Sequence, residues 1–256
     1  MGNFLHSRLY QDYLSVFSTT VKTILRNSKN VKFEPEVMIL DKIVDPGSIC
    51  LDIGAAYGRY ALPLSRIVGR AGRVYSFEPG RYSYRVLTAI KKFYGLNNVI
   101  VTKKALSDKE KQIKLFSPIK RSGKVGPSLA YIDEKENSDA LCEVVSMTTI
   151  DVFCSQENIK RVDFIKCDIE GAELLAYQGG VGVIERDKPV VMSEVDEKSL
   201  NRYGQSVKDL EDFFFSKGYK LAVFEDGNLK GIGHFQGSRN YFFIHGSRWE
   251  KIIKKF

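Results

Sequence analysis

The chain has 256 residues, of which 43% are hydrophobic and 27% charged, and it carries a net charge of +8. This composition excludes an intrinsically disordered chain, and the length is sufficient for a large buried core. No stretch approaches the ~20 consecutive apolar residues of a membrane-spanning helix. The four cysteines show no metal-ligand spacing, and we expect a cytoplasmic protein.

Basic residues gather near both ends of the sequence, at Lys22, Arg26, Lys29 and Lys32 and again at Arg248, Lys251, Lys254 and Lys255. Such clusters can attract anionic lipid or nucleic acid. Their density is too low to identify a partner, because most charge runs are solvated surface. Peripheral membrane contact through these ends stays open, and a nucleic-acid partner is not expected.

Residues 1–45 are expected to form a helical extension, followed by a single α/β domain over residues 46–256. Apolar residues in the extension recur at helical spacing, at Leu9, Tyr13, Val16, Phe17, Val21, Ile24 and Leu25. A second short helix is expected over 37–43, before the turn Asp45-Pro46-Gly47.

Strand and helix patterns then alternate along the chain. Strands are expected at 49–53, 73–77, 98–103, 162–167, 190–195, 219–224 and 241–244, and helices at 59–68, 82–93, 172–178 and 207–216. Short apolar strands that alternate with helices predict a doubly wound, mostly parallel sheet, here with seven strands. The last two strands are joined by a segment too short for a crossover helix, so the last strand should be antiparallel.

A small β insertion is expected between the third and fourth strands of this sheet. Residues 111–116 and 143–147 have strand character, and a polar loop over 117–140 separates them. Long loops in compact domains are often functional lids. We therefore expect this loop and the N-terminal helices to shape a binding pocket.

A turn of small residues follows the first strand, in the run Leu51-Asp52-Ile53-Gly54-Ala55-Ala56-Tyr57-Gly58. Ligands of open α/β sheets bind at the carboxyl ends of strands, and glycines let them approach the backbone. The dinucleotide fingerprint GxGxxG would need glycine where Ala56 and Arg59 stand, which disfavours a diphosphate. An acid before the turn suits an ammonium group. A cofactor is thus expected on Asp52, Gly54, Ala55, Ala56, Tyr57 and Gly58.

The second strand ends in Phe77-Glu78-Pro79. An acid at this position is well placed to accept hydrogen bonds from both hydroxyls of a ribose. Glu78 is therefore a candidate cofactor ligand.

Carboxylates are concentrated in a third motif, Asp163-Phe164-Ile165-Lys166-Cys167-Asp168-Ile169-Glu170-Gly171-Ala172-Glu173. Strand alternation places Lys166, Asp168 and Glu170 on one face. Mutual repulsion makes such a cluster costly unless it serves a general base, a cation or a ligand ammonium. Acids also favour helix N-termini, which would account for Glu170 and Glu173 without a function.

These motifs resemble the FkbM-type methyltransferases, from about residue 49 to residue 195. The resemblance rests on LDIGAAYG, YSFEPG, VTKKALSD, SMTTID, DFIKCDIEGAE and SEVD. Ala56 departs from the pattern, since the family usually has Asn there. The resemblance implies a Rossmann-like class I methyltransferase fold, S-adenosylmethionine as cofactor, and methyl transfer to a hydroxyl, often on a sugar or natural product. It adds Ala105, in VTKKALSD, and Asp168 to the cofactor-binding candidates.

The sequence is compatible with two mechanisms for such a methyl transfer. A carboxylate could take the hydroxyl proton, with Asp168 the first candidate catalytic residue and Glu170, Glu173 or Glu194 as alternatives. A divalent cation, held by Asp168 and Glu194, could instead lower the pKa of the hydroxyl.

Other functions are weighed against this one. Amino-directed nucleic-acid methyltransferases carry an [N/D/S]-P-P-[Y/F] run where this chain has Asp168-Ile169-Glu170-Gly171, and cytosine-C5 enzymes need a Pro-Cys pair that is missing. Two alternatives remain. One is an RNA methyltransferase, and the other is a catalytically silent cofactor-binding module that docks on a membrane or nucleic acid. A small-molecule or glycan acceptor remains the preferred partner.

Overall fold

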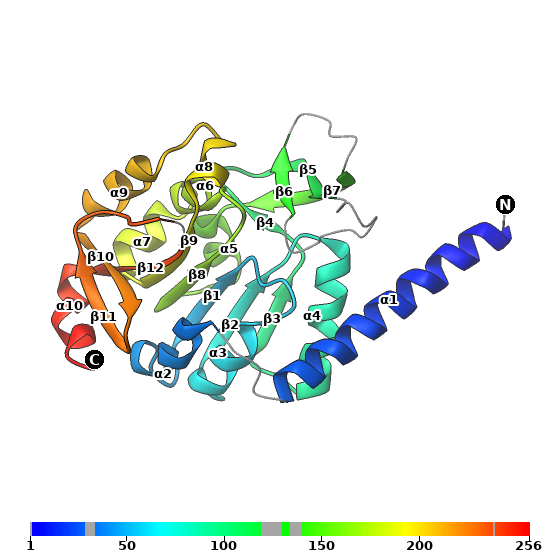
Figure 1. The fold of residues 1–256 in the computed structure, drawn as a ribbon, viewed down its shortest axis with the longest axis horizontal. Coiled ribbons are helices and arrows are strands. Elements are labelled where there is room, and N and C mark those ends of the chain that lie inside the picture. Colours follow the sequence, from blue (N-terminus) through cyan, green and yellow to red (C-terminus); the bar gives the residue numbers. More distant parts are fainter. Residues whose placement is uncertain (1, 29–33, 119–129, 134–139, 238) are drawn as a thin grey trace.

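A mostly parallel sheet lies at the centre of the computed structural model, which describes residues 2–28, 34–118, 130–133, 140–237 and 239–256 (Figure 1). The described strands of this sheet number eight, in the order β11-β10-β12-β9-β8-β1-β2-β3. Their bounds are β1 Ile49–Ile53, β2 Arg73–Phe77, β3 Val99–Thr102, β8 Phe164–Cys167, β9 Val190–Val195, β10 Tyr219–Glu225, β11 Asn228–Ile232 and β12 Arg239–His245. The expected α/β fold with a mostly parallel sheet is confirmed.

Helices cover both faces of the sheet because successive strand residues point to opposite sides. Cys50 packs in a cluster with α2 (Leu40–Ile43), α3 (Ala61–Val68), α4 (Arg81–Tyr94) and α10 (Gly246–Ile253). Leu51 and Ile53 pack in a second cluster with α5 (Ile150–Gln156), α6 (Glu173–Gln178), α7 (Val181–Asp187), α8 (Glu197–Asn201) and α9 (Val207–Phe215). These two clusters fix the three-layer arrangement.

The expected count of seven strands is wrong, because β11 lies in the segment between the last two predicted strands. Asp226 and Gly227 have φ values of 53° and 79°, the conformation of a tight hairpin turn between β10 and β11. β11 is polar and lies at the sheet edge, so its sequence lacks the apolar alternation of a core strand. β12 is inserted between β9 and β10 and is antiparallel to both.

A second sheet lies between β3 and β8 in the sequence, where two insertion strands were expected. In the described residues it has four strands, β4 (Ala105–Leu106), β5 (Lys111–Pro118), β6 (Tyr131–Asp133) and β7 (Ala140–Thr148), in the order β4-β7-β5-β6. β6 falls within the predicted 117–140 loop. Most of that loop, residues 119–129 and 134–139, lies outside the described residues.

The N-terminal helix α1 (Gly2–Ser28) packs against α4 and extends beyond the domain (Figure 1). Val16 contacts a small cluster with Val86 and Ile90, and the Tyr82 hydroxyl lies 2.7 Å from Thr19 Oγ1. The short helix expected over 37–43 is a 3-10 turn, η1 (Pro35–Ile39), that continues into α2. In the part of the chain that the structure describes, no helix combines the length and apolar character needed to cross a bilayer.

Candidate functional site

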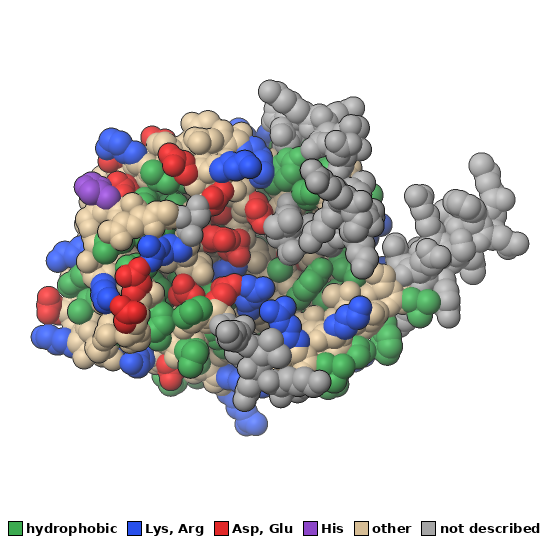
Figure 2. Space-filling model, viewed as in Figure 1, with side chains coloured by type: hydrophobic (Ala, Val, Ile, Leu, Met, Phe, Trp, Pro, Cys, Tyr) green, Lys and Arg blue, Asp and Glu red, His purple; other side chains and the backbone are tan. Residues whose placement is uncertain are grey.

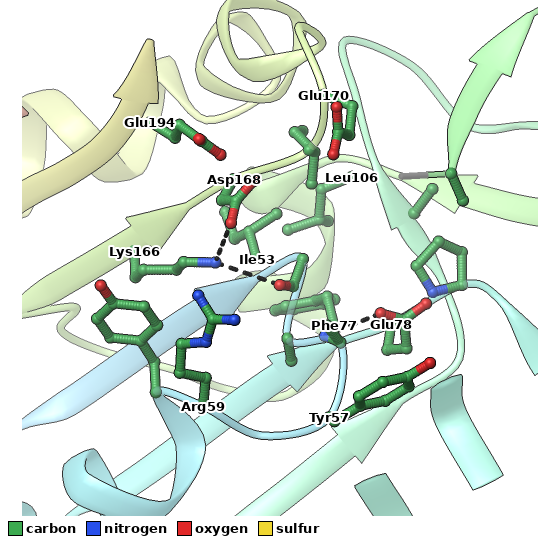
Figure 3. A pocket seen from close by; sticks show the side chains of 18 of the residues that line it. Ile53, Tyr57, Arg59, Phe77, Glu78, Leu106, Lys166, Asp168, Glu170 and Glu194 are labelled. Atoms are coloured by element: carbon green, nitrogen blue, oxygen red, sulfur yellow. Dashed lines mark hydrogen bonds and ion pairs between the residues drawn. The ribbon is translucent and has the colours of Figure 1, made fainter. Parts of the chain in front are cut away.

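The register of three parallel strands brings the sequence motifs together. Ile53, the last residue of β1, pairs with Phe77 of β2 on one side and with Cys167 of β8 on the other. The residues that follow are Gly54, Glu78 and Asp168, which therefore meet at one edge of the sheet. They line a cavity of about 690 Å³ (Figure 3).

The turn after β1 depends on glycine because two loops meet there. Gly54 has a φ of +77°, and a Cβ at this position would lie 1.9 Å from the Asp168 carbonyl oxygen. The backbone amides of Gly54 and Ala55 both donate to the Phe77 carbonyl oxygen, at 3.1 and 3.0 Å. The turn is thus fixed to β2 and pressed against the loop after β8. Gly58 adopts a φ of +81° behind the turn and does not line the cavity.

Glu78 is held by the Gly-rich turn and by its own loop. Its carboxylate accepts hydrogen bonds from the backbone amides of Ala56 and Gly80, both at 2.9 Å. Burial raises the pKa of Glu78 to about 8, although these two donors favour the charged form. Ala56 donates from a left-handed conformation, with a φ of 45°; the Asn usual in the family tolerates that conformation better than Ala does.

Lys166 is a buried ammonium that joins the first and third motifs. Its Nζ donates to the Gly54 carbonyl oxygen and to Asp168 Oδ2, both at 3.2 Å (Figure 3), and lies 5.1 Å from the centre of the Tyr60 ring. Burial opposes its charge, but the Asp168 and Asp52 carboxylates outweigh burial and raise the pKa of Lys166. Its side chain is therefore a fixed positive charge under the cavity.

Asp52 lies behind the cavity and does not line its wall. It is fully buried, its Oδ2 lies 3.4 Å from the Ser76 hydroxyl, and its Oδ1 has no hydrogen-bond partner among the described residues. Burial raises the pKa of Asp52 to about 6, with Lys166 and Ser76 acting in the opposite direction. The structure thus places this expected cofactor ligand beside Lys166.

Asp168 and Glu194 form a hydrogen-bonded acid pair at the carboxyl ends of β8 and β9. The Asp168 side chain is 36% exposed. Burial opposes its ionisation, but Lys166 and a hydrogen bond from Glu194 hold its pKa below the ordinary value. The same hydrogen bond, with burial, raises the pKa of Glu194. The pair therefore shares one hydrogen-bonded proton, and the neighbouring Lys166 ammonium favours the negative charge on Asp168.

The two remaining candidate acids differ in place and role. Glu170 lines the cavity with a φ of +59°, and burial raises its pKa. Glu173 does not line the cavity: its Oε1 accepts from the backbone amides of Ile169 at 2.8 Å and Gly171 at 3.2 Å. Burial raises the pKa of Glu173 to about 7. The Glu173 carboxylate therefore holds the loop after β8, and its expected catalytic role stays a prediction that its position outside the cavity wall does not support.

Several residues that border the cavity were not named as cofactor-binding or catalytic candidates on the sequence. They come from α1, from the segment before η1, from the turn before α3, from the connection between β3 and β4 and from β6, at Thr23, Arg26, Asn27, Glu34, Arg59, Tyr60, Lys104 and Tyr131. Arg59 Nη1 and the Tyr60 hydroxyl both donate to the Glu34 carboxylate, which ties the N-terminal segment to the cavity. Long-range contacts of this kind leave no local pattern. Ala105, Ala55 and Tyr57 line the cavity, as does Ala56.

Among the described residues, no group of three or more His, Cys, Asp and Glu is arranged to hold a metal ion. Asp168 and Glu194, the two expected ligands, share a hydrogen bond. His234 and His245 lie apart from the cavity; His234 Nδ1 is 3.2 Å from Glu211, and His245 Nδ1 accepts from the Ser247 backbone amide.

Residues 52–221 match the family model of the methyltransferase FkbM domain, which is well over half of the chain. The chain belongs to the FkbM methyltransferase family. The matched region is a methyltransferase domain, and S-adenosylmethionine is the cofactor expected for it. No curated protein sequence matches it significantly.

Solved structures similar to this methyltransferase include the FkbM methyltransferase of Methylobacillus flagellatus KT, with 17% identity and a TM-score of 0.51. That match covers 78% of this chain but only 44% of the other, so the chain spans less than half the length of that protein. A methyltransferase of Aquifex aeolicus has 16% identity, a TM-score of 0.45, and coverage of 83% and 90%. A putative methyltransferase of Streptococcus mutans, solved with SAH, has 9% identity, a TM-score of 0.47, and coverage of 82% and 94%.

The cavity of the methyltransferase is chemically suited to its cofactor. Ile53, Phe77 and Leu106 supply apolar wall that can cover an adenine ring. Glu78 supplies acceptor oxygens at the end of β2, and the ionised Asp168 suits a positively charged group. This combination of apolar wall, acceptor oxygens and negative charge therefore fits S-adenosylmethionine.

Proposed function

We propose that this methyltransferase acts on a hydroxyl group of a small-molecule or glycan acceptor, with Asp168 as the base. The observation that carries this proposal is the position of Asp168, whose carboxylate is partly exposed, lines the cavity and lies 3.2 Å from the Lys166 ammonium (Figure 3). S-adenosylmethionine supplies, when bound, an electrophilic methyl group. The chain must then orient the acceptor and take up one proton.

Asp168 suits this proton transfer although its pKa is low. A hydroxyl becomes strongly acidic only as its oxygen forms the new bond, so a weak base that is always ionised suffices. Lys166, at 3.2 Å, keeps the Asp168 carboxylate charged before the transfer. A hydrogen bond shared with Glu194 fixes the orientation of the Asp168 carboxyl group. Positioning supplies the remaining rate enhancement.

The turn over residues 54–57, Ala105 and Glu78 are assigned to the cofactor. The turn exposes backbone at the edge of the cavity, where Gly54 leaves no side chain in the way. Glu78 keeps its carboxylate oriented through Ala56 and Gly80, so its oxygens are preorganised to accept hydrogen bonds from a ribose diol.

Replacing Glu78 by alanine is expected to weaken S-adenosylmethionine binding by roughly ten- to a hundred-fold, because leaving the ribose hydroxyls without their buried acceptor costs ~1–3 kcal/mol. Isothermal titration measures the affinity. Glu157→Ala, at an exposed acid outside the cavity, is the matched control and should bind normally. Unchanged affinity in Glu78→Ala would remove this residue from the cofactor site.

The acceptor class is tested by following a labelled methyl group from S-adenosylmethionine into monosaccharides, small hydroxylated compounds and an RNA oligonucleotide. We expect label in a hydroxylated small molecule or sugar, and none in an analogue whose reacting hydroxyl is replaced by hydrogen. Label only in RNA would establish the alternative RNA methyltransferase. Cofactor binding without transfer to any acceptor would favour the catalytically silent module.

A further inference from the structure

Two neighbouring helices expose apolar side chains on the outside of the methyltransferase. On α1, Leu14, Phe17 and Val21 are 47%, 62% and 37% exposed, and their spacing of three and four residues places them on one helix face. On α4, Phe93 is 64% exposed. Large exposed apolar side chains grouped in this way mark interaction surfaces rather than ordinary surface.

The same two helices are exclusively basic over the segments that carry these side chains. Residues 14–28 and 81–94 contain no Asp or Glu, and six Lys and Arg, at Lys22, Arg26, Arg81, Arg85, Lys91 and Lys92. Arg81, Arg85 and Lys92 recur at helical spacing on one side of α4. The α1–α4 face, meaning the exposed side chains of these two segments, therefore combines apolar and basic groups, and Figure 2 shows hydrophobic and basic side chains next to one another along α1.

The basic cluster at the other end of the chain is different. Lys251 and Lys255 each lie 3.4 Å from the Asp45 carboxylate, and Lys254 lies 3.7 Å from Glu250. None of Lys22, Arg85 and Lys92 forms an ion pair with any described residue. The basic side chains of the α1–α4 face are therefore better suited than the ion-paired C-terminal cluster to attract an anionic partner.

We propose that the α1–α4 face docks on an anionic lipid bilayer. Apolar side chains of an interfacial helix enter the boundary between headgroups and acyl chains while flanking Lys and Arg contact anionic headgroups. A second copy of this chain fits the face less well, because two basic surrounds would meet. RNA phosphates would pair with the basic side chains of this face but would leave the apolar side chains of Phe17 and Val21 in water. Thr23 and Arg26 of α1 also border the cavity, so the docked helix lies beside the active site.

Vesicle flotation of the full chain tests the proposal. The protein should float with phosphatidylcholine–phosphatidylglycerol vesicles at low salt, float much less at high salt, and remain in solution with pure phosphatidylcholine. Flotation that is equal on both vesicle types would contradict the charge requirement. No flotation on anionic vesicles would overturn the proposal.

Point variants separate the two contributions. Phe17→Ser should lower the partition coefficient at least about ten-fold, because one buried aromatic side chain is lost from the interface. Lys22→Ala and Lys92→Ala should each lower it about five-fold at low salt. Lys254→Ala, a basic residue paired at the opposite end, is the matched control and should float like the wild type. Circular dichroism and S-adenosylmethionine binding verify that each variant is folded.

Two further outcomes would replace the proposed partner. A dimer in sedimentation equilibrium that dissociates on Phe17→Ser would identify the face as an interface between two copies. Retention of an RNA oligonucleotide, together with no flotation on anionic vesicles, would identify a nucleic-acid surface. Either result overturns the lipid-docking proposal.

Discussion

Asp168→Asn is expected to lower kcat by ~10²–10⁴ while cofactor affinity changes much less. Asparagine keeps the shape and hydrogen-bonding capacity of the side chain but removes its charge and basicity. Lys166 retains Asp52 as a compensating charge, so the variant should fold. Methyl transfer to a verified acceptor measures kcat, and calorimetry measures the affinity for S-adenosylmethionine.

Asp212→Asn is the matched control for this variant. Asp212 is an exposed acid on α9, paired with Lys208 at 2.9 Å on the helix surface, and its loss should leave kcat unchanged. Adding EDTA to the wild-type enzyme distinguishes a base from a metal ligand, because only a metal-dependent reaction loses activity. Normal turnover by Asp168→Asn would refute the mechanism and leave the acids near α6 as a loop-holding cluster.

Gly54→Ala is expected to destabilise the protein by roughly 3 kcal/mol or more and to abolish cofactor binding. The new Cβ would lie 1.9 Å from the Asp168 carbonyl oxygen and 2.9 Å from its carbonyl carbon. Backbone must move to relieve this contact, in addition to the ~1–2 kcal/mol cost of a left-handed conformation and the ~1–3 kcal/mol typical of overpacking. Urea denaturation measures the change in the free energy of unfolding.

Gly95→Ala separates the two components of this loss. Gly95 ends α4 in the left-handed conformation with a φ of 61°, and a Cβ there would have nothing within 4 Å. This variant should lose only ~1–2 kcal/mol and bind the cofactor normally. Equal losses in Gly54→Ala and Gly95→Ala would show that the approach of the two loops is not tight.

The parallel sheet and its ligand-binding edge are predictable from the sequence because both depend on local patterns. Short apolar runs alternate with helical spacing, and Gly54, Glu78 and Asp168 each follow a strand directly. Strand ends in a parallel sheet must meet at one edge, so three separate motifs converge without further information. The carboxyl-end position of the cavity follows from the same rule.

The strands that escape prediction are short, polar or at an edge. β11 has little apolar alternation and exists because Asp226 and Gly227 turn the chain back onto β10. β6 has three residues and is held by pairing with β5. Their partners, rather than their own propensities, decide their structure.

The sequence alone determined the fold class, the family resemblance and a set of acids near one sheet edge. It could not rank these acids, because carboxylates have the same chemistry until burial and neighbours distinguish them. The tertiary structure places Asp52 behind the cavity, ties Glu173 to backbone amides, and leaves Asp168 ionised at the cavity. That difference arises from Lys166 on β8, whose buried ammonium donates to the Gly54 carbonyl oxygen after the neighbouring strand β1. This contact exists only once the sheet has formed.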